Sequence, residues 1–441
     1  MNVSQLFPNV TEIFQIVGTF FLHGGWLLLV AVIIYIAFTM YKEEISHQWV
    51  HSQEWVFLNV KVPKENLTST LAVENIFSQM HALHTSITFA QKYVEGKDQL
   101  WYSLEIISLG GKISFIIRTP KKSRDLVEAS FYAQYPQAEI AEVADYMENV
   151  NYDPVTSDLS MWGTEWKELE DFTIPIRTYK DFEHPTAEEK IIDPLAPHFE
   201  ALAKMGPHEF YGVQIIIQPL GDAEWKNKGE AKVMELIGEE APHKASFLDF
   251  FMAPFNWFAK FSYRETLVGG GHGNGHDDEN KQKNNWVSMT EFAKERVNLV
   301  ERKISKPGYR TKIRHMYLAP KDKADPSKKS VVIGSYRPLG SAMTNTFKPD
   351  TKRTWTSLEY SVSPTLEKPY IDYEENRRKR NMFRGYKNRD IHLGNPMFIL
   401  NVEEIATLYH FPISLATASS VEKTESKKSQ APVNLPVAEE Y

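Results

Sequence analysis

The order of apolar runs between residues 55 and 146 constrains the fold more than any other feature of this sequence. Four runs have the β-branched and aromatic content of strands: "WVFLNVKV" (55–62), "LWYSLEIISL" (100–109), "KISFIIRT" (112–119) and "AEIAEVADY" (138–146). Two others have helical spacing: "LAVENIFSQMHALHTSI" (71–87) and "SRDLVEASFYAQYP" (123–136). The order is β-α-β-β-α-β, which predicts a ferredoxin-like module over residues 45–150.

A second, looser round of the same order follows over residues 165–412. The expected strands are 171–179, 209–220, 309–320 and 354–363, and the expected helices are 187–205 and 328–339. Residues 221–307 are an insertion between the middle strands, with helices at 222–238 and 289–304. The polar tail, 413–441, has the composition of a disordered segment. The fold class predicted is α+β, an N-terminal transmembrane helix followed by two ferredoxin-like modules, the second with a long insertion.

The stretch "SLGGKIS" (108–114) looks at first like a phosphate-binding loop. Gly110 and Gly111 lie between two predicted strands, where glycine supplies the positive φ of a tight hairpin. A phosphate loop would precede a helix and would need glycine at position 106, which is Ile106. The sequence therefore predicts a β-hairpin here. No other segment reads as a Walker A loop, including "GSYRPLGS" (334–341).

The N-terminal segment 13–41 has no charged residue and predicts a membrane-spanning helix. Its core is formed by Trp26, Leu27, Leu28, Leu29, Val30, Ile33 and Ile34. A cleaved signal peptide would need a basic start and a shorter apolar core, which are missing. Lys42 follows the run, so the positive-inside rule places 1–12 outside and the bulk of the chain in the cytoplasm. The expected location is the inner (cytoplasmic) membrane, crossed once, with the lipid bilayer as a partner.

Composition excludes several classes of site. The 441 residues carry a formal net charge of −7, which argues against a general nucleic-acid binder, and include no cysteine, which excludes thiol catalysis and cysteine zinc sites. We find no nucleophile–base–acid set, and we expect neither an enzyme nor a cofactor. His272, His276, Asp277 and Asp278 suit a metal by chemistry, but a glycine-rich run is typical of a solvated loop, and we predict no metal site.

Two segments are candidate contact sites. "SFLDFFMAPFNWFAKFSY" (246–263) is either a membrane-interface loop, through Phe250, Phe251, Phe255, Trp257 and Phe258, or a helix packed on the core or a partner. "NRRKRNMFRGYKNRD" (376–390) interleaves basic residues with Phe383 and Tyr386. It is a solvated charged helix, a nucleic-acid contact or a lipid headgroup contact, and its basic residues are Arg377, Arg378, Lys379, Arg380, Arg384, Lys387 and Arg389.

Two stretches carry a family resemblance. They are "LEIISLGGKISFIIRTPKKSRDLVEASFYAQYPQAEIAEVADY" (104–146) and "FILNVEEIATLYHFP" (398–412), the second followed by "APVNLP" (431–436). They resemble the N-terminal region of large membrane-anchored proteins from uncultivated bacteria, in which that region precedes an ATPase similar to the DNA-pumping motors of conjugation and type IV secretion. "PIRTYKDFE" (175–183) and "KIRHMYLAP" (312–320) fit the same pattern. The resemblance covers most of residues 45–436, and the function of the region is unknown in that family.

The resemblance implies a function through the neighbouring motor. In longer relatives the motor would begin soon after "NLP", whereas this sequence has no phosphate loop, so we expect a separate ATPase chain or a stand-alone paralogue. Our first hypothesis is a non-catalytic, membrane-anchored scaffold that docks a translocation ATPase or other secretion-system subunits, with a homo-oligomer suggested by analogy. The alternative is a membrane-tethered module that binds nucleic acid, DNA included, through the basic segment. A third hypothesis is an enzyme with an unrecognised site.

Overall fold

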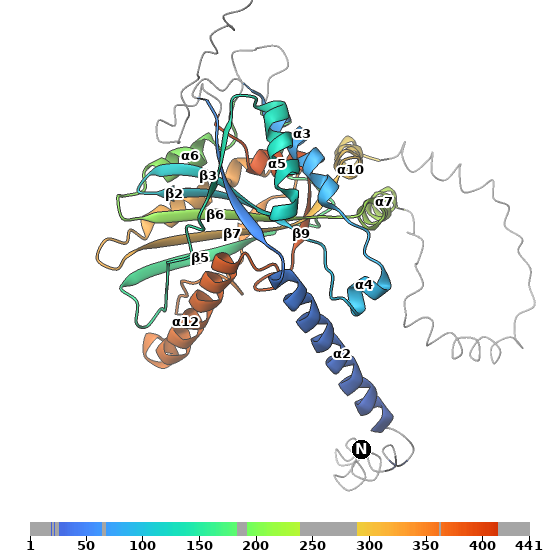
Figure 1. The fold of residues 1–441 in the computed structure, drawn as a ribbon, viewed down its shortest axis with the longest axis horizontal. Coiled ribbons are helices and arrows are strands. Elements are labelled where there is room, and N and C mark those ends of the chain that lie inside the picture. Colours follow the sequence, from blue (N-terminus) through green and yellow to red (C-terminus); the bar gives the residue numbers. More distant parts are fainter. Residues whose placement is uncertain are drawn as a thin grey trace, which may run out of the picture. The chain divides into compact units, whose positions relative to one another are not determined.

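The computed structural model describes residues 26–63, 68–182, 192–238, 289–360 and 363–412, together with Thr19 and Leu22. These residues fall into two units, which we describe separately. One comprises the chain up to Glu54 together with Thr85–Leu100, and the other comprises Trp55–His84 and the chain from Trp101 onward. The second unit holds the β-sheet (Figure 1).

The β-sheet is antiparallel and has nine strands in the order β4-β1-β3-β2-β6-β7-β5-β8, with β9 pairing with β7. The strands are β1 Trp55–Lys61, β2 Tyr102–Leu109, β3 Lys112–Pro120, β4 Glu139–Val143, β5 Leu159–Glu168, β6 Phe210–Pro219, β7 Gly308–Pro320, β8 Phe347–Pro349 and β9 Phe398–Asn401. Two inner strands, β6 and β7, are almost continuously buried, as expected for strands covered on both faces.

Helices cover both faces of the sheet (Figure 1). The helices of this unit are α3 Thr70–Met80, α5 Arg124–Gln134, α6 Ala196–Ala203, α7 Asp222–Ile237, α10 Glu291–Ile304, α11 Ser327–Gly334, α12 Pro364–Asn388 and α13 Val402–Leu408, of which α7 and α10 pack on each other. On one face, Phe115 of β3 packs against Phe199 of α6 and against Tyr409 and Phe411, which follow α13. On the other face, α12 crosses β5 and β7. Apolar residues on both faces therefore find partners in the same unit.

The prediction of two ferredoxin-like modules was wrong as a fold class, because the strands join in one continuous sheet. The join is the antiparallel pairing of β2 with β6, from Tyr102 opposite Ile217 to Leu109 opposite Phe210. Both strands carry apolar side chains on two faces, so neither could be a solvated edge strand. The fold is therefore an α+β domain with a single antiparallel sheet, and not two modules with a sheet each.

Two predicted strands of the second half were also wrong. Residues 171–179 do not form a strand, because their N–H groups bond elsewhere, as when the amide of Ile176 donates to Glu404 Oε1 at 2.9 Å. The strand that precedes β6 in the chain is instead β5, Leu159–Glu168. Residues 354–360 are irregular, and the short β8 precedes them. The strands at 210–219 and 308–320 and the helices at 222–237 and 291–304 confirm the predictions made for those segments.

The hairpin predicted at "SLGGKIS" is confirmed. Leu109 pairs with Lys112, and the two residues between them are Gly110 and Gly111, with φ of 61° and 83°. Positive φ at both central residues is the requirement of a type I′ hairpin turn. A Cβ on Gly111 would also lie 2.7 Å from the carbonyl oxygen of Ala203, so the position excludes a side chain for two reasons.

The other unit contains α2, Trp26–His51, and the short α4, Phe89–Tyr93. Phe38 stacks on Tyr93 with ring centroids 5.5 Å apart. A Cβ on Gly96 would lie 2.4 Å from the carbonyl oxygen of Ile45. The segment 85–100 therefore packs closely along the second half of α2.

The prediction of a membrane-spanning helix, and of a single-pass membrane location, is not supported. Among the residues that the structure describes, no helix combines the length and the hydropathy that a membrane crossing requires. The described apolar part of α2 ends at Tyr41, before Lys42, Glu43 and Glu44. At about 1.5 Å per residue, Trp26–Tyr41 is roughly 24 Å long, short of a hydrocarbon core of about 30 Å. Most of residues 1–25 lies outside the described chain.

Candidate docking surface on α12

The predicted basic segment forms the second half of α12. The helix begins after Ser363, with Pro364 in its first turn, and ends at Asn388, capped by Arg389, which takes the left-handed conformation with φ of 54°. A non-glycine residue with positive φ needs compensation from its surroundings. Hydrogen bonds and ion pairs around Arg389 and the last turn of α12 supply this compensation.

A row of polar side chains crosses the sheet beneath the last turn of α12. Glu105 on β2, Gln214 on β6, Arg314 on β7 and Glu165 on β5 stand opposite one another in register and are at most 1% exposed. Gln214 Nε2 donates to Glu105 Oε1 at 3.1 Å, and Arg314 Nε donates to Glu165 Oε1 at 2.8 Å. We call these four residues the cross-strand polar row.

The cross-strand polar row also bonds the C-terminal carbonyls of α12. Arg314 Nη1 donates to the carbonyl of Gly385 at 2.9 Å, and Gln214 Nε2 donates to that of Tyr386 at 3.0 Å. A cation at the C-terminal end of a helix offsets both its orphan carbonyls and its dipole. Gly212 lets the Tyr386 ring approach β6, because a Cβ there would lie 1.9 Å from the tyrosine hydroxyl oxygen. The end of α12 is therefore fixed to the middle of the sheet.

Arg389 lies at the Glu105 end of the cross-strand polar row. It is 1% exposed, and its guanidinium donates to Glu105 Oε1 at 3.0 Å and to Asp145 Oδ2 at 2.6 Å. Burial alone would raise the pKa of Glu105, but the charge and hydrogen bonds of Arg389 bring that pKa below its usual value. The structure thus places Arg389, predicted as a nucleic-acid or lipid contact, inside the protein as an ion-pair partner.

Three more residues of the predicted contact site have internal partners. Arg378 donates to the carbonyls of Thr351, Lys352 and Trp355 at 3.2, 2.7 and 3.1 Å. Lys387 donates to the carbonyls of Glu148 and Val150 at 3.0 and 2.8 Å, and Lys379 pairs with Glu375 at 3.2 Å. Arg378 and Lys387 thereby fix loops to the helix.

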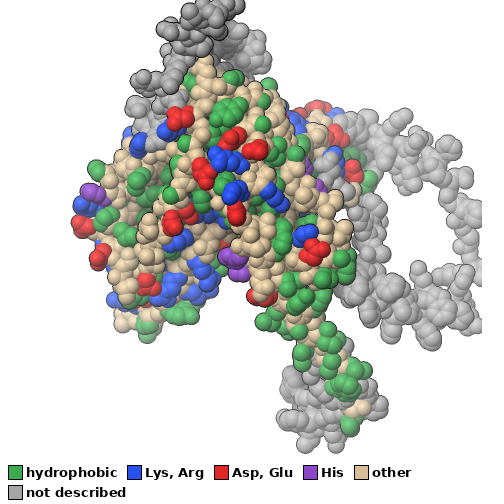
Figure 2. Space-filling view, viewed as in Figure 1, with side chains coloured by type: hydrophobic (Ala, Val, Ile, Leu, Met, Phe, Trp, Pro, Cys, Tyr) green, Lys and Arg blue, Asp and Glu red, His purple; other side chains and the backbone are tan. Residues whose placement is uncertain are grey.

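The remaining basic residues lie on one outward face of α12. Exposed tyrosines precede these arginines on the same face, at helical spacing. The members of the face, all exposed, are Leu366, Tyr370, Tyr373, Arg377, Arg380 and Arg384. Arg377 pairs with Glu374 at 2.7 Å and Arg380 with Asp153 at 3.1 Å, while Arg384 has no side-chain partner among the described residues. Figure 2 shows Lys and Arg side chains gathered at the lower left, where Figure 1 places α12. We call these six residues the α12 face.

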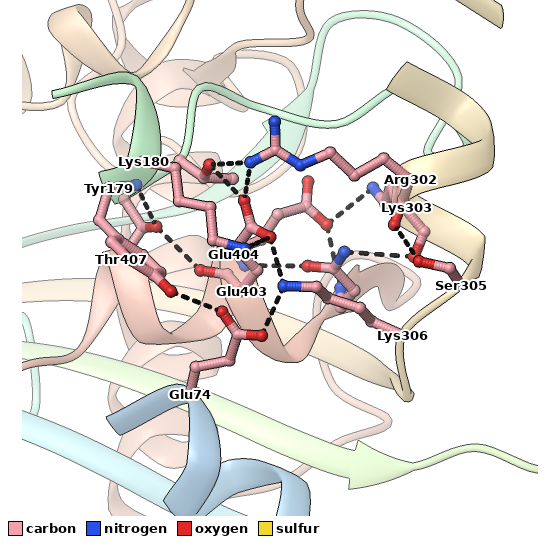
Figure 3. A network of polar contacts seen from close by, with 12 residues as sticks. Glu74, Tyr179, Lys180, Arg302, Lys303, Ser305, Lys306, Glu403, Glu404 and Thr407 are labelled. Carbon is pink, nitrogen blue, oxygen red and sulfur yellow. Dashed lines mark hydrogen bonds and ion pairs between the residues drawn. The ribbon is translucent and has the colours of Figure 1, made fainter. Parts of the chain in front are cut away.

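A second polar network joins α3, α10 and α13 (Figure 3). Glu403, which is 1% exposed, accepts hydrogen bonds from Lys306, Arg302, Lys180 and Thr178. Burial would raise its pKa, but these donors lower that pKa to about 2. Lys306 also bonds Glu74 of α3. The acids of "NVEEIATL" therefore stabilise the fold by holding α10, which lies near the end of the predicted insertion, against the sheet domain.

Beside it, Lys303 of α10 lies fully buried between two carboxylates. Its Nζ is 3.1 Å from Glu404 Oε2 and 3.9 Å from Glu168 Oε1. Glu168 Oε1 is buried and has no hydrogen-bond partner among the described residues. Burial raises the pKa of Glu168 to about 8, although Lys303 acts in the opposite direction. The site therefore holds two acids against one cation.

The other candidate residues from the sequence are not part of α12. Trp26, Leu27, Val30, Ile33 and Ile34 are exposed on α2, and the side chains of Leu28 and Leu29 are outside the described part. The aromatic loop residues (Phe250, Phe251, Phe255, Trp257 and Phe258) and the His/Asp run (His272, His276, Asp277 and Asp278) lie outside the described residues. Within the described residues, no group of three or more His, Asp or Glu side chains could hold a metal ion.

Sequence reasoning missed the cross-strand polar row. The available signal was a polar residue with apolar neighbours on both sides, Glu105 in "SLEIISL" and Gln214 in "GVQIIIQ". Such a residue is costly to bury alone, so it indicates a buried partner. The identity of that partner depended on strand order.

The class of this protein is defined by its fold and its site alone. It is an α+β domain built on one sheet, with an exposed basic face on a helix that is fixed to that sheet. No family model matches the chain, and no curated protein matches it significantly.

Proposed function

We propose that this chain is a non-catalytic docking module that acts with a separate translocation ATPase. The observation that carries the proposal is the α12 face, which presents tyrosines and arginines side by side on an immobilised helix. Tyrosine and arginine are over-represented among the residues that dominate protein–protein binding energy. A rigid helix also loses little conformational entropy on binding.

The family resemblance supports the choice of an ATPase as the partner. The face is basic at its C-terminal half, and segment 376–389 contains no acidic residue. We therefore expect an acidic patch on the partner, which would steer association and make its rate fall with salt. The resemblance concerns a region that precedes a motor in longer chains, so a motor in a separate chain would need such a docking surface.

Site-specific crosslinking tests this proposal. A photoreactive amino acid replaces Tyr370 in the full chain expressed in its native cells, and the matched control carries it at Tyr132, an exposed tyrosine on α5. We expect the Tyr370 position to crosslink to a chain that contains a Walker A loop, and Arg384→Glu to abolish the product. Equal products from both positions, or ATP hydrolysis by the purified chain alone, would contradict the proposal.

Nucleic-acid binding is the second candidate, and the exposure of Arg377, Arg380 and Arg384 next to two tyrosines favours it. Arginines neutralise phosphates and tyrosines stack on bases. The triple variant Arg377→Ala/Arg380→Ala/Arg384→Ala should lose binding to a single-stranded oligonucleotide and reduce its salt dependence. Arg378 is unsuitable for this test because its loss would release the 351–355 turn. Binding that survives the triple variant would exclude the α12 face.

A further inference from the structure

A cavity of about 410 Å³ opens between the turn that follows β8 and the middle of α12. Lys352, Arg353 and Thr354 line it from the turn, and Leu393 and Gly394 line it from the segment after α12. The helix contributes three charged residues, one amide and one apolar residue to the lining: Glu374, Arg377, Arg378, Asn381 and Met382. A volume of this size falls within the range of small-ligand sites, which is roughly 300–1,000 Å³.

The turn that forms one wall is held in place from both sides. Asp350 is 2% exposed, accepts the amide N–H of Lys352 at 3.2 Å and pairs with Lys167 at 2.7 Å. From the other side, Arg378 bonds the carbonyls of residues in the turn, that of Lys352 among them, at 2.7 Å. With its carbonyls directed to Arg378, the turn is preorganised, which is the condition for precise placement of binding groups.

The carboxylates at this cavity are already neutralised. Glu374 accepts hydrogen bonds from Arg377 and Arg378, and these donors bring its pKa down to about 2. Glu165 accepts from Arg314, which belongs to the cross-strand polar row. Without Lys352 and Arg353 of the turn, two acids (Glu165 and Glu374) are therefore paired with three arginines (Arg314, Arg377 and Arg378).

Lys352 and Arg353 add two cations that have no side-chain partner among the residues that the structure describes. Both are exposed, and both line the cavity. Placing two unpaired cations beside a neutralised pair of acids leaves a local excess of positive charge. Arginine in particular presents a planar fork that matches the geometry of a phosphate.

We propose that this cavity binds a ligand that carries a phosphate monoester, held by Lys352 and Arg353 with its uncharged part against Met382 and Leu393. Inorganic phosphate alone is far smaller than the cavity, so a nucleoside monophosphate or the terminal phosphate of a nucleic-acid strand fits better. The proposal stands independently of ATPase docking, since a docking module needs no small ligand.

The neighbouring cavity is a poorer anion site. Its volume is about 510 Å³ and it shares Lys352 and Arg353, but Glu168, Glu170 and Asp171 also line it. Acids at the wall, Glu170 and Asp171 among them, repel phosphate. The shared cations therefore favour an anion on the α12 side.

Isothermal titration of the full chain with adenosine 5′-monophosphate tests the proposal, with adenosine as the uncharged control. We expect binding of one monophosphate per chain and no binding of adenosine. Arg353→Ala and Lys352→Ala should each weaken binding about tenfold or more, the loss of one charge-assisted hydrogen bond. Lys348→Ala removes an exposed cation of β8 that does not line the cavity and should leave affinity unchanged.

Oligonucleotides with and without a 5′-phosphate distinguish the two sources of the phosphate. Tighter binding of the phosphorylated oligonucleotide than of the mononucleotide assigns the site to strand ends, and the reverse order assigns it to a free ligand. The proposal is overturned if no phosphate monoester binds, or if Arg353→Ala and Lys352→Ala both bind as the unmodified protein does. Because both residues are exposed, the variants should fold, and their unfolding curves check this directly. Loss of phosphate binding with intact crosslinking at Tyr370 would separate this site from docking.

Discussion

Titration of Glu168 should change the stability of this protein strongly with pH. The isosteric variant Glu168→Gln removes the titration and keeps the side-chain shape. In the folded protein burial raises the pKa of Glu168 from 4.5 to about 8. A carboxyl with a raised pKa binds its proton more tightly in the folded chain than in the unfolded chain, so stability falls as pH rises between these two values.

The size of the effect follows from those two pKa values. Each pH unit between about 4.5 and about 8 costs the folded protein about 1.4 kcal/mol relative to the unfolded chain. Below about pH 4.5 the contribution of Glu168 is fully present, and at pH 7 about 3 kcal/mol of it has been lost. At pH 7 the Glu168→Gln variant should therefore be more stable than the unmodified protein by about 3 kcal/mol.

Urea unfolding followed by tryptophan fluorescence measures this difference, since Trp166 lies two residues away and is buried. The difference in unfolding free energy between variant and unmodified protein should grow steadily from about pH 5 to about pH 8. Glu301→Gln is the matched control, because Glu301 is exposed on the same helix as Lys303 and should give no such trend. A difference for Glu168→Gln that stays constant across this range would refute the reasoning.

Three further predictions concern buried charge and backbone conformation. Arg389→Met should destabilise the protein by about 3–5 kcal/mol in urea unfolding, because it leaves Glu105 buried without its cation, and adding Glu105→Leu should recover much of the loss; a double variant no better than the single one would contradict this. Gly111→Ala should cost more than Gly238→Ala, since both have φ of 83° but only the first would bring a Cβ against a carbonyl oxygen, and equal melting temperatures would argue against the steric cause. Burial lowers the pKa of Lys312 to about 8, so stability should rise with pH from about 8 to about 10.5, and Lys312→Met should lack that rise in urea titrations.

Local sequence determined the elements whose causes are local. The two glycines at 110 and 111 predicted the hairpin because positive φ at consecutive residues leaves few other choices. The apolar runs at 209–220 and 309–320 and the apolar face of 289–304 predicted β6, β7 and α10, because burial follows directly from such patterns, and the polar segment 222–238 predicted α7. The same reasoning missed β5, since "LSMWGTEWKE" contains Gly163 and the charged Glu165 in the middle of the strand.

Only the tertiary structure decided where the polar residues lie. Glu165 is buried because Arg314 stands opposite it on β7, a pairing between residues 149 positions apart that no local pattern encodes. Strand order depends on which edges find a partner, so the pairing of β2 with β6, and with it one sheet instead of two, was also beyond the sequence.

The basic segment shows the same division. Its sequence determined the amount of positive charge and the interleaved aromatics, since both are properties of composition. Tertiary packing then turned Arg389 inward to Glu105 and Arg378 toward the 351–355 turn, while Arg377, Arg380 and Arg384 remained outside. The physical reason is that a buried carboxylate or a row of carbonyls needs a donor, and the nearest arginines supplied it.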